Sequence, residues 1–193
     1  MDALEAIRER RSIRRFKADP VPQEALRTLL EAARWAPSWG NTQCWRMIVV
    51  QDLQLQGKLA DTVAATAGRA ALAIRSVPVV LAACAELGKS GFQRTGEHAG
   101  QPATDRGDWF MFDVALALGN LTLAAHALGL GTVHVGLFDH LRAEEVLGVP
   151  QGFTVVELMP VGYPDEKPDP RPRKSLEEFV YYNAFGQGFS GRL

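Results

Sequence analysis

The feature that most constrains how this chain can fold is one long apolar segment, Asp108 to Leu128, which predicts a helix with almost no polar face. Three polar residues, Asp113, Asn120 and His126, interrupt the most lipid-like stretch, from Phe110 to Gly131. Polar groups are costly in hydrocarbon, so we expect a buried helix rather than a membrane span. A helix that is apolar all round must be covered on every side. The rest of its own domain or a partner must supply that cover.

The pattern around this helix predicts alternating helices and strands within one domain spanning residues 1–193. The expected helices are Asp2 to Arg10, a helix from Pro22 that ends before Pro37, Leu53 to Arg69, and Leu141 to Leu147. The expected strands are Arg46 to Gln51, Val77 to Ala85, Gly131 to Leu137 and Phe153 to Val161. This order indicates an α/β or α+β fold around one mixed sheet.

Charge and cysteine content exclude several classes of protein. A net charge of −1 lacks the basic footprint of a nucleic-acid-binding protein, so we expect no nucleic-acid partner. The two cysteines, Cys44 and Cys84, are too few for a four-cysteine zinc site or a disulfide framework. The first fifteen residues lack the apolar core of a signal peptide. We therefore expect a cytoplasmic protein that binds no metal and does not enter a membrane.

Neither of the two glycine-containing stretches that resemble nucleotide-binding motifs is complete. Gly88-Lys89-Ser90 lacks the glycine five residues earlier, and Gly129-Leu130-Gly131 lacks the third glycine of a dinucleotide fingerprint. The four histidines are scattered, with no paired ligand spacing. The sequence therefore predicts neither a phosphate-binding loop, nor a separate nicotinamide domain, nor a zinc site.

Two segments without the periodicity of a helix or strand are expected to form functional surfaces. Residues 87–107 are rich in Gly, Ser, Gln and Thr, and a loop this long in a compact domain is often a lid, here with Phe92 and Trp109 near it. Residues 164–193 form a proline-rich arm that ends in five aromatic residues: Phe179, Tyr181, Tyr182, Phe185 and Phe189. Exposed aromatic residues are a liability unless they pack on something. We expect this arm to lie across a partner subunit.

Two clusters of arginine stand at opposite ends of the chain. The first, the basic elbow, runs from Arg10 to Phe16 and includes Ser12; the second is Arg171-Pro172-Arg173. Guanidinium groups fork onto phosphate oxygens, so a buried phosphate monoester would satisfy both clusters. The residues alone leave two alternatives open, a solvated face paired with nearby acids and a nucleic-acid patch.

A second polar segment, Ala36 to Trp45, runs straight into a predicted strand. Its serine, asparagine and glutamine offer neutral donors and acceptors for amide-like ring edges, and its tryptophans offer flat apolar surface. Together with the basic elbow, the Ala-Leu-Gly-Leu-Gly end of the apolar helix, and Gly162-Tyr163-Pro followed by Arg171 to Lys174, this segment resembles the nitroreductase-like flavoprotein family. Cys44 departs from the pattern, because the family usually has proline before the tryptophan. It either reshapes the loop or leaves a thiol near the flavin edge.

The resemblance implies a homodimer with a mixed sheet flanked by helices and two FMN sites at its interface. It implies that Arg10, Ser12 and Arg173 hold the FMN phosphate, with Arg171 close by and Arg11 near the ribityl chain or phosphate. Arg14 would approach the N1/O2 edge of the ring, where a fixed cation stabilises the negative charge of the reduced flavin.

The remaining cofactor contacts implied by the resemblance come from two further segments. Pro37, Ser38 and Asn41 would reach the flavin from the other subunit. Val133, His134, Val135 and Gly136 would lie along the ring, with the Gly136 backbone N–H donating to N5. We therefore expect Gly136 and Arg14 to be the catalytic groups, and the His134 ring to pack without titrating.

The implied activity is ping-pong hydride transfer from NADH or NADPH through flavin N5 to a nitroaromatic, a quinone or a similar small acceptor. Two alternatives stay open. One is a specialised branch that performs reductive dehalogenation, heterocycle dehydrogenation or flavin fragmentation, and the other is a non-catalytic flavin-binding protein. The apolar helix and the arm would build an interface in the obligate range, above about 2,000 Å², so we expect no stable monomer.

Overall fold

The structure, a computed structural model, describes residues 1–188 of the chain. Its core is a four-stranded sheet in the order β1-β2-β4-β3, where β1 is Trp45–Val50, β2 is Val79–Glu86, β4 is Phe153–Gly162 and β3 is Gly131–Thr132. All three strand pairings are antiparallel. Among residues 1–188, the parallel component of the expected mixed sheet is limited to one bridge, between Ser12 and Thr132.

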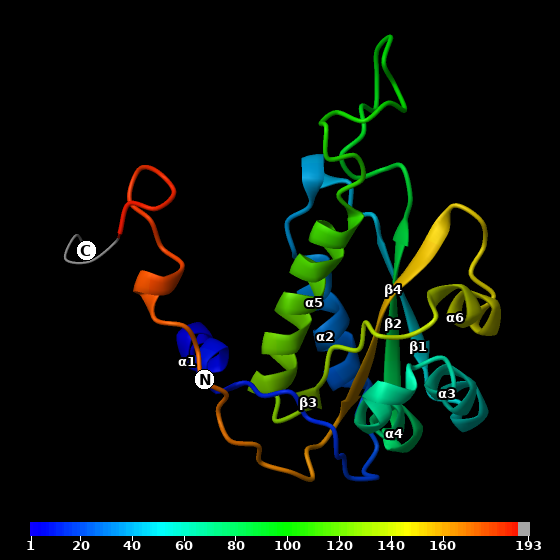
Figure 1. The fold of residues 1–193 in the computed structure, drawn as a ribbon. Helices are drawn as coiled ribbons and strands as arrows, with labels where there is room; N and C mark the ends of the chain where they lie inside the picture. Colours follow the sequence, from blue (N-terminus) through cyan, green and yellow to red (C-terminus); the bar gives the residue numbers. More distant parts are fainter. Residues whose placement is uncertain (189–193) are drawn as a thin grey trace.

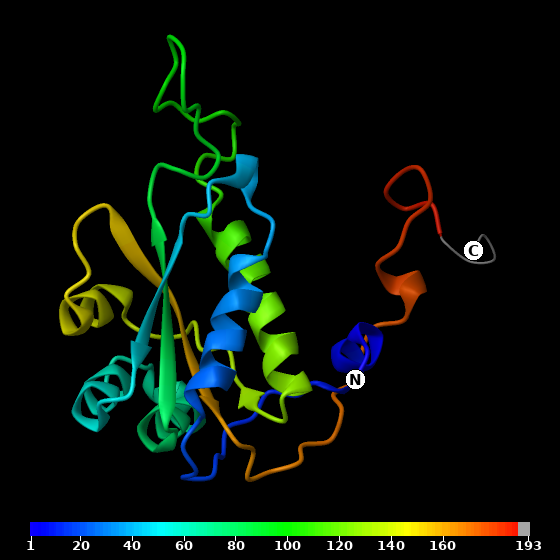
Figure 2. The same cartoon turned by 180° about the vertical axis from the view of Figure 1, so that it is seen from behind.

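Helices cover both faces of the sheet (Figures 1 and 2). On one face lie α2, Gln23–Arg34, and α5, Phe110–Ala127. On the other lie α3, Leu53–Ala60, α4, Gly68–Ser76, and α6, His140–Leu147. Strand β2 is buried along nearly its whole length, which explains why its sequence is a continuous apolar run rather than an alternating one.

Two predicted elements differ from the structure. The single helix expected over Leu53 to Arg69 divides into α3 and α4, and the strand expected over Gly131 to Leu137 shortens to the two residues of β3. The cause is mutual pairing of the intervening chain: the Ala64 N–H donates to the Leu137 carbonyl at 3.1 Å, and the Asp139 N–H donates to the Thr62 carbonyl at 2.8 Å. These bonds take the first segment out of helical geometry. The second segment still meets β4 at Val135, which forms an isolated antiparallel bridge with Leu158.

Helix α5 packs against α2 and the sheet, but the described part of this single chain does not cover it all round. Val114, Leu118 and Leu121 are buried, whereas Met111 and Phe112 in its first turn are 58% and 55% exposed. By length and composition alone α5 could cross a membrane, although core helices of water-soluble proteins meet the same criterion. A partner copy over the exposed side stays a prediction.

Helix α1, Ala3–Glu9, packs beside α5 and buries Ala6, whereas the later part of the C-terminal arm stands away from the main body (Figure 1). Beyond the short 3-10 helix Leu176–Glu178, the arm exposes Phe179 and Phe185, and the latter is 91% exposed. Phe189, the last aromatic residue of the predicted arm, lies outside the described residues. The placement of the arm across a partner subunit also stays a prediction.

Candidate functional site

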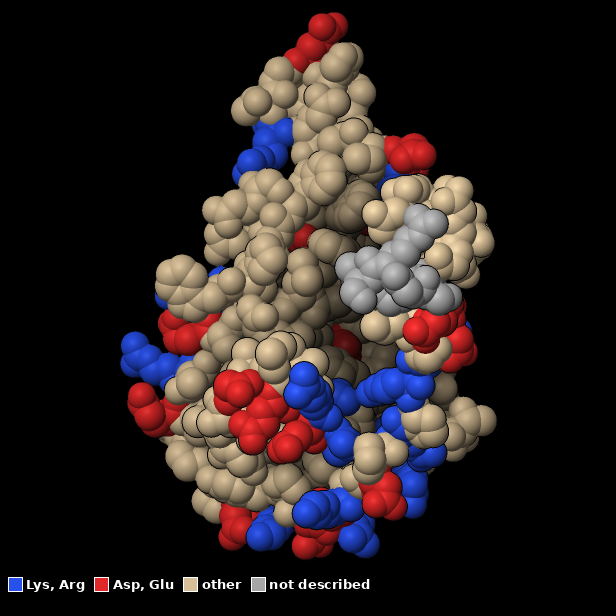
Figure 3. Space-filling model, turned by 90° about the vertical axis from the view of Figure 1, so that its left-hand side faces the viewer, with Lys and Arg blue, Asp and Glu red and all other residues tan. Residues whose placement is uncertain are grey.

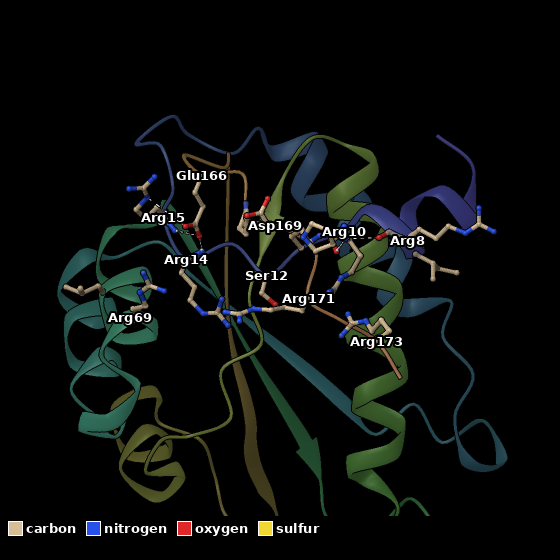
Figure 4. Close-up of a pocket in the computed structure, with 15 residues that line it drawn as sticks. Arg8, Arg10, Ser12, Arg14, Arg15, Arg69, Glu166, Asp169, Arg171 and Arg173 are labelled. Atoms are coloured by element: carbon tan, nitrogen blue, oxygen red, sulfur yellow. Dashed lines mark hydrogen bonds and ion pairs between the residues drawn. The ribbon is translucent and has the colours of Figure 1, made fainter. Parts of the chain in front are cut away.

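The basic elbow and the arm enclose one cavity of about 950 Å³, named here the basic cavity (Figure 4). Its arginines are Arg8, Arg10, Arg11, Arg14, Arg15, Arg69, Arg171 and Arg173. Ser12 lines it too, as do the carboxylates Glu166 and Asp169. The fold therefore brings the two arginine clusters, about 160 residues apart in the sequence, to a single cavity. In Figure 3, Lys and Arg side chains gather over the lower part of the same side of the molecule.

A close backbone contact holds the elbow in place. Helix α1 ends at Arg10, whose φ of −57° and ψ of 140° lead the chain into an extended path. The Ile13 N–H then donates to the Thr132 carbonyl at 2.9 Å. A Cβ on Gly131 would lie 2.6 Å from Ile13 Cγ1, so only glycine permits this approach. The elbow thereby lies along the edge of the sheet.

Three hydrogen bonds to backbone groups join the elbow to the start of the arm. The Asp165 N–H donates to the Arg15 carbonyl at 3.0 Å. In return, the Glu166 carboxylate accepts the backbone N–H groups of Arg14 at 2.5 Å and Arg15 at 3.2 Å. These contacts turn the arm across the elbow, so that its arginines face the same cavity.

The arginines that line the basic cavity outnumber its carboxylates, and one of their buried donors has no acceptor within residues 1–188. Burial lowers the pKa of Arg10, and the nearby charges of Arg173 and Arg11 lower it further. The Arg10 Nε is buried and has no hydrogen-bond partner among the described residues. Arg11, in contrast, donates from Nη1 to the carbonyls of Arg8 at 2.7 Å and Arg10 at 2.9 Å, which close the end of α1. Mutual repulsion and an orphaned buried donor are what a site for an anion with several oxygen atoms would contain.

A second cavity of about 330 Å³ adjoins the first, and Arg14 and Arg69 line both. Its other walls include residues 133–137, so Val133, His134, Val135 and Gly136 line the same cavity as Arg14. Gly136 is exposed, and a Cβ there would meet nothing within 4 Å. The fold therefore places an open backbone segment beside a cationic side chain, next to the basic cavity.

The structure corrects the expectation that the His134 ring is simply packed. Its side chain is 42% exposed, and its Nδ1 lies 2.6 Å from Glu157 Oε1. Its Nε2 lies 3.2 Å from the Thr122 hydroxyl. Polar partners on β4 and α5, rather than apolar packing, hold the ring.

The loop that carries Pro37, Ser38 and Asn41 lies at the other end of the molecule and lines neither cavity (Figure 1). Ser38 Oγ accepts the Gln43 N–H at 3.0 Å, and Asn41 Oδ1 accepts from the Gln43 side chain at 3.1 Å. Asn41 and Gln43 both have positive φ, which marks a tight, specifically shaped loop. One chain thus does not join all of the predicted cofactor residues.

A buried carboxylate organises this loop. Asp113, fully buried in the first turn of α5, accepts the Trp39 N–H at 2.9 Å, the Thr42 hydroxyl at 3.1 Å and the Ser90 hydroxyl at 2.7 Å. The Cys44 thiol lies 3.6 Å from the same carboxylate. Asp113 therefore ties the loop, the start of β1 and the base of the predicted lid to α5.

The departure from the family pattern at Cys44 has a clear structural outcome. The side chain is fully buried and points toward Asp113. Burial raises the pKa of the Cys44 thiol to about 12, and the Asp113 charge and hydrogen bond act in the same direction. The thiol is therefore neutral and enclosed within its own subunit, away from any exposed edge of the loop.

The predicted lid, residues 87–107, contains no helix or strand and projects beyond the body of the molecule (Figure 2). Its base is fixed by aromatic contacts, because the Trp109 ring lies 5.2 Å from the Trp39 ring and 5.6 Å from the Phe112 ring. Gly91 lies so close to Trp109 that a Cβ would come within 2.5 Å of its ring. The lid is thus anchored beside the loop that Asp113 organises, and its closure over a substrate stays a prediction.

Reasoning from the sequence missed three residues of this arrangement. Arg69 lines both cavities but stands in an alanine-rich stretch with no distinguishing pattern. Glu166 was one of several charges in a proline-rich segment. Asp113 gave the clearest signal, because a carboxylate within an otherwise apolar helix needs polar partners. Among the described residues, no group of three or more His, Cys, Asp or Glu side chains could hold a metal ion.

Comparison with known proteins agrees with this geometry. Residues 7–163 match the model of the Nitroreductase family. A protein of Streptococcus pneumoniae described as a nitroreductase family protein has a solved structure that superposes with a TM-score of 0.79 at 26% identity, covering 94% of this chain and all of that one. The NADPH:FMN oxidoreductase from Vibrio harveyi, solved in complex with NAD⁺, superposes with a TM-score of 0.77 at 25% identity over 96% of this chain and 78% of that chain.

Proteins with comparable sequence identity to this chain are named as different enzymes. A Thermus thermophilus protein named NADH dehydrogenase is 35% identical over 94% of this chain and 96% of its own length. A 5,6-dimethylbenzimidazole synthase of Rhodospirillum rubrum is 32% identical over 86% of this chain and 84% of its own. An iodotyrosine deiodinase of Thermotoga neapolitana is 29% identical over 91% of this chain and 96% of its own.

Proposed function

The chain belongs to the nitroreductase family, and on that premise we propose that it is an FMN-dependent oxidoreductase that takes electrons from NADH or NADPH. The observation that carries the proposal is the convergence of Arg10, Ser12 and Arg173 on one cavity, where the buried Arg10 Nε lacks a partner. A phosphate monoester supplies the acceptor oxygens that this donor needs.

The residues of the basic cavity fit the phosphate end of FMN. Arg10, Ser12 and Arg173 would donate to its oxygens, and Arg171 would add charge at the same side of the cavity. Arg11 would contribute from its second nitrogen, because its Nη1 already closes helix α1. A dianionic phosphate would also cancel the repulsion between Arg10 and Arg173 that lowers the pKa of Arg10.

The adjoining cavity fits the ring end. When bound, FMN takes a hydride at N5 from NADH or NADPH and passes the electrons to a small acceptor. Arg14 would hold a positive charge at the edge of the ring, favouring the reduced state. Residues 133–136 would support one face, and the exposed Gly136 N–H would donate to N5, a role in which no side-chain rotation can misplace the donor.

A homodimer would complete the site. Pro37, Ser38 and Asn41 lie far from both cavities of their own chain, so a second copy would have to bring them to the flavin. The exposed Met111 and Phe112 and the aromatic arm would supply apolar contact for that copy. We propose one such homodimer with two FMN sites, in the cytoplasm, where both buried cysteines stay reduced.

The acceptor would be a nitroaromatic, a quinone or a similar small molecule that occupies the same open face after the nicotinamide leaves. A specialised reaction is the second candidate, because relatives of comparable similarity are named 5,6-dimethylbenzimidazole synthase and iodotyrosine deiodinase. A fold constrains the cofactor more than the acceptor, so the lid and the loop of residues 36–45 would choose the acceptor.

The test is a visible spectrum of the purified full-length protein, followed by anaerobic titration with NADH and with NADPH. We expect a yellow protein that either nicotinamide bleaches and that a nitroaromatic or quinone reoxidises. A protein that stays colourless and binds no added FMN would refute the proposal. Bound FMN that neither nicotinamide bleaches would instead favour a non-catalytic flavin-binding protein. Turnover under air and under nitrogen separates the general reductase from a specialised oxygen-dependent reaction.

A further inference from the structure

Glu166 is an unusual residue to find at an anion site. Its carboxylate lines the basic cavity, and its side chain is only 24% exposed. A negative charge there opposes the binding of any anion. The other carboxylate of this cavity, Asp169, makes no hydrogen bond or ion pair within the described part of the chain, whereas Glu166 makes several (Figure 4).

The contacts of Glu166 all cross from the arm to the elbow. Its Oε1 accepts the backbone N–H groups of Arg14 at 2.5 Å and Arg15 at 3.2 Å. Its Oε2 lies 3.9 Å from Arg15 Nε, a weak contact because the Arg15 side chain is 70% exposed. The two backbone bonds are the substantial ones, since bonds to an ionised acceptor are stronger than those between neutral groups.

The elbow and the arm need such a tie because their own charges oppose each other. Arg173 of the arm lies close enough to Arg10 of the elbow to lower the pKa of Arg10, in addition to the effect of burial. Proline residues stiffen the arm, but beyond Glu166 it stands away from the main body (Figure 1). Any ordering that the protein does not supply must be taken from the binding energy of the ligand.

We propose that Glu166 is a positioning residue that holds the elbow against the arm, so that the basic cavity is formed before its anion binds. It acts on the anion through the arginines of the arm, whose position against the elbow it fixes, and this positioning outweighs the opposing negative charge that it adds to the cavity. The identity of the anion as the FMN phosphate rests on the proposed function, whereas the role of Glu166 does not.

Two substitutions distinguish the effect of the hydrogen bonds from Glu166 to the elbow from the effect of its negative charge. Glu166→Gln keeps an oxygen that accepts both backbone N–H groups but removes the opposing charge. Glu166→Ala removes the charge and the tie together. If Glu166 were only a counter-charge, both variants would bind the anion more tightly. If Glu166 only supported the fold, both variants would weaken every ligand alike.

The experiment measures dissociation constants of FMN and riboflavin for the flavin-free full-length protein and its variants. Riboflavin keeps the ring but lacks the phosphate, so it makes no use of Arg10, Arg171 and Arg173 as phosphate ligands. We expect Glu166→Ala to bind FMN about 10-fold more weakly, as for the loss of one or two charged hydrogen bonds at a partly exposed site, with riboflavin unchanged. We expect Glu166→Gln to bind FMN at least as tightly as the wild type. Asp169→Asn is the matched control for charge and should bind FMN equally or more tightly.

The inference would be overturned if Glu166→Ala and Glu166→Gln lost FMN affinity equally. It would also be overturned if Glu166→Ala lost FMN and riboflavin affinity in parallel. If Glu166→Ala does not fold, Glu166→Asp replaces it, because it keeps the charge but shortens the reach by one methylene, and it should weaken FMN while Gln does not. If the wild type binds neither flavin, the proposed function fails. The same variants titrated with inorganic pyrophosphate then still test the positioning role, with Ala expected to be weaker than Gln.

Discussion

Replacing Arg173 by alanine should change cofactor affinity and apoprotein stability in opposite directions. Arg173 would contribute a charge-assisted hydrogen bond to the phosphate, and such a bond is worth about 1.5 to 3 kcal/mol. Because Arg173 is exposed, the lower end applies, which corresponds to about 10-fold weaker FMN binding. Arg10 is partly buried and its Nε lacks a partner, so Arg10→Ala should cost more, about 100-fold.

The apoprotein should respond differently. Without an anion, Arg173 disfavours the charge of Arg10, which is one reason why the pKa of Arg10 is lowered. Removing Arg173 relieves that repulsion, so the melting temperature of the flavin-free protein should stay constant or rise, although most truncations lower it. The FMN-saturated variant should melt below the FMN-saturated wild type, because weaker binding gives less stabilisation.

The assay is quenching of flavin fluorescence during titration of the apoprotein, at low and at high salt, with riboflavin as the ligand without phosphate. Arg34→Ala is a matched control, because Arg34 is a surface arginine paired with Glu31 outside both cavities. The FMN affinity of the wild type should fall as salt rises, and Arg173→Ala should reduce that dependence. Wild-type FMN affinity in both Arg10→Ala and Arg173→Ala would refute the reasoning, as would an equal loss of riboflavin affinity.

Four further outcomes are expected. Arg14→Ala should slow reduction by NAD(P)H more than it weakens FMN binding, because the cation acts on the reduced ring; stopped-flow rates unchanged from the wild type would contradict this role. Cys44 and Cys84, whose pKa values burial raises to about 12 and about 11, should resist thiol reagents at pH 8 until denaturant is added, and rapid labelling of the native protein would be inconsistent with their burial. Because their neutral forms favour the folded state, the stability they contribute should be complete below about pH 8.5 and lost as the pH rises through 11 to 12. Asp113→Ala should lower the free energy of unfolding, measured in urea, by about 3 kcal/mol, because the buried donors around Asp113 lose their acceptor. Asp113→Asn should lower it by less, since an amide oxygen still accepts. Equal losses in the two variants would show that these hydrogen bonds are not what stabilises the loop.

The local elements could be read from the sequence because they depend on local patterns. Helix α2 starts after Pro22 and places Leu26, Leu29 and Ala33 on its buried face. The predicted strands at β1, β2 and β4 differ from the observed ones by one or two residues at their ends. Apolar periodicity and turn residues are sufficient for such elements. The break between α3 and α4 was missed because it depends on hydrogen bonds to residues 137–139, which no local pattern encodes.

The two arginine clusters and the polar loop could be recognised from composition and order, because arginine pairs and a run of Ser, Asn and Gln carry their chemistry in the side chains. Their arrangement could not. Whether residue 10 meets residue 173 depends on Gly131 admitting Ile13 and on Glu166 tying the elbow to the arm. Both contacts join positions more than a hundred residues apart.

Residue types thus determined by themselves which groups could bind an anion and which strands would be buried, and they determined where helix α2 begins. The tertiary structure alone decided that the basic residues share one cavity, that Cys44 is enclosed against Asp113, and that His134 is held by Glu157 and Thr122. The physical reason is one of range. Propensity and periodicity act over a few residues, whereas a cavity, an ion pair or a buried carboxylate exists only where distant segments are brought within a few ångströms of each other.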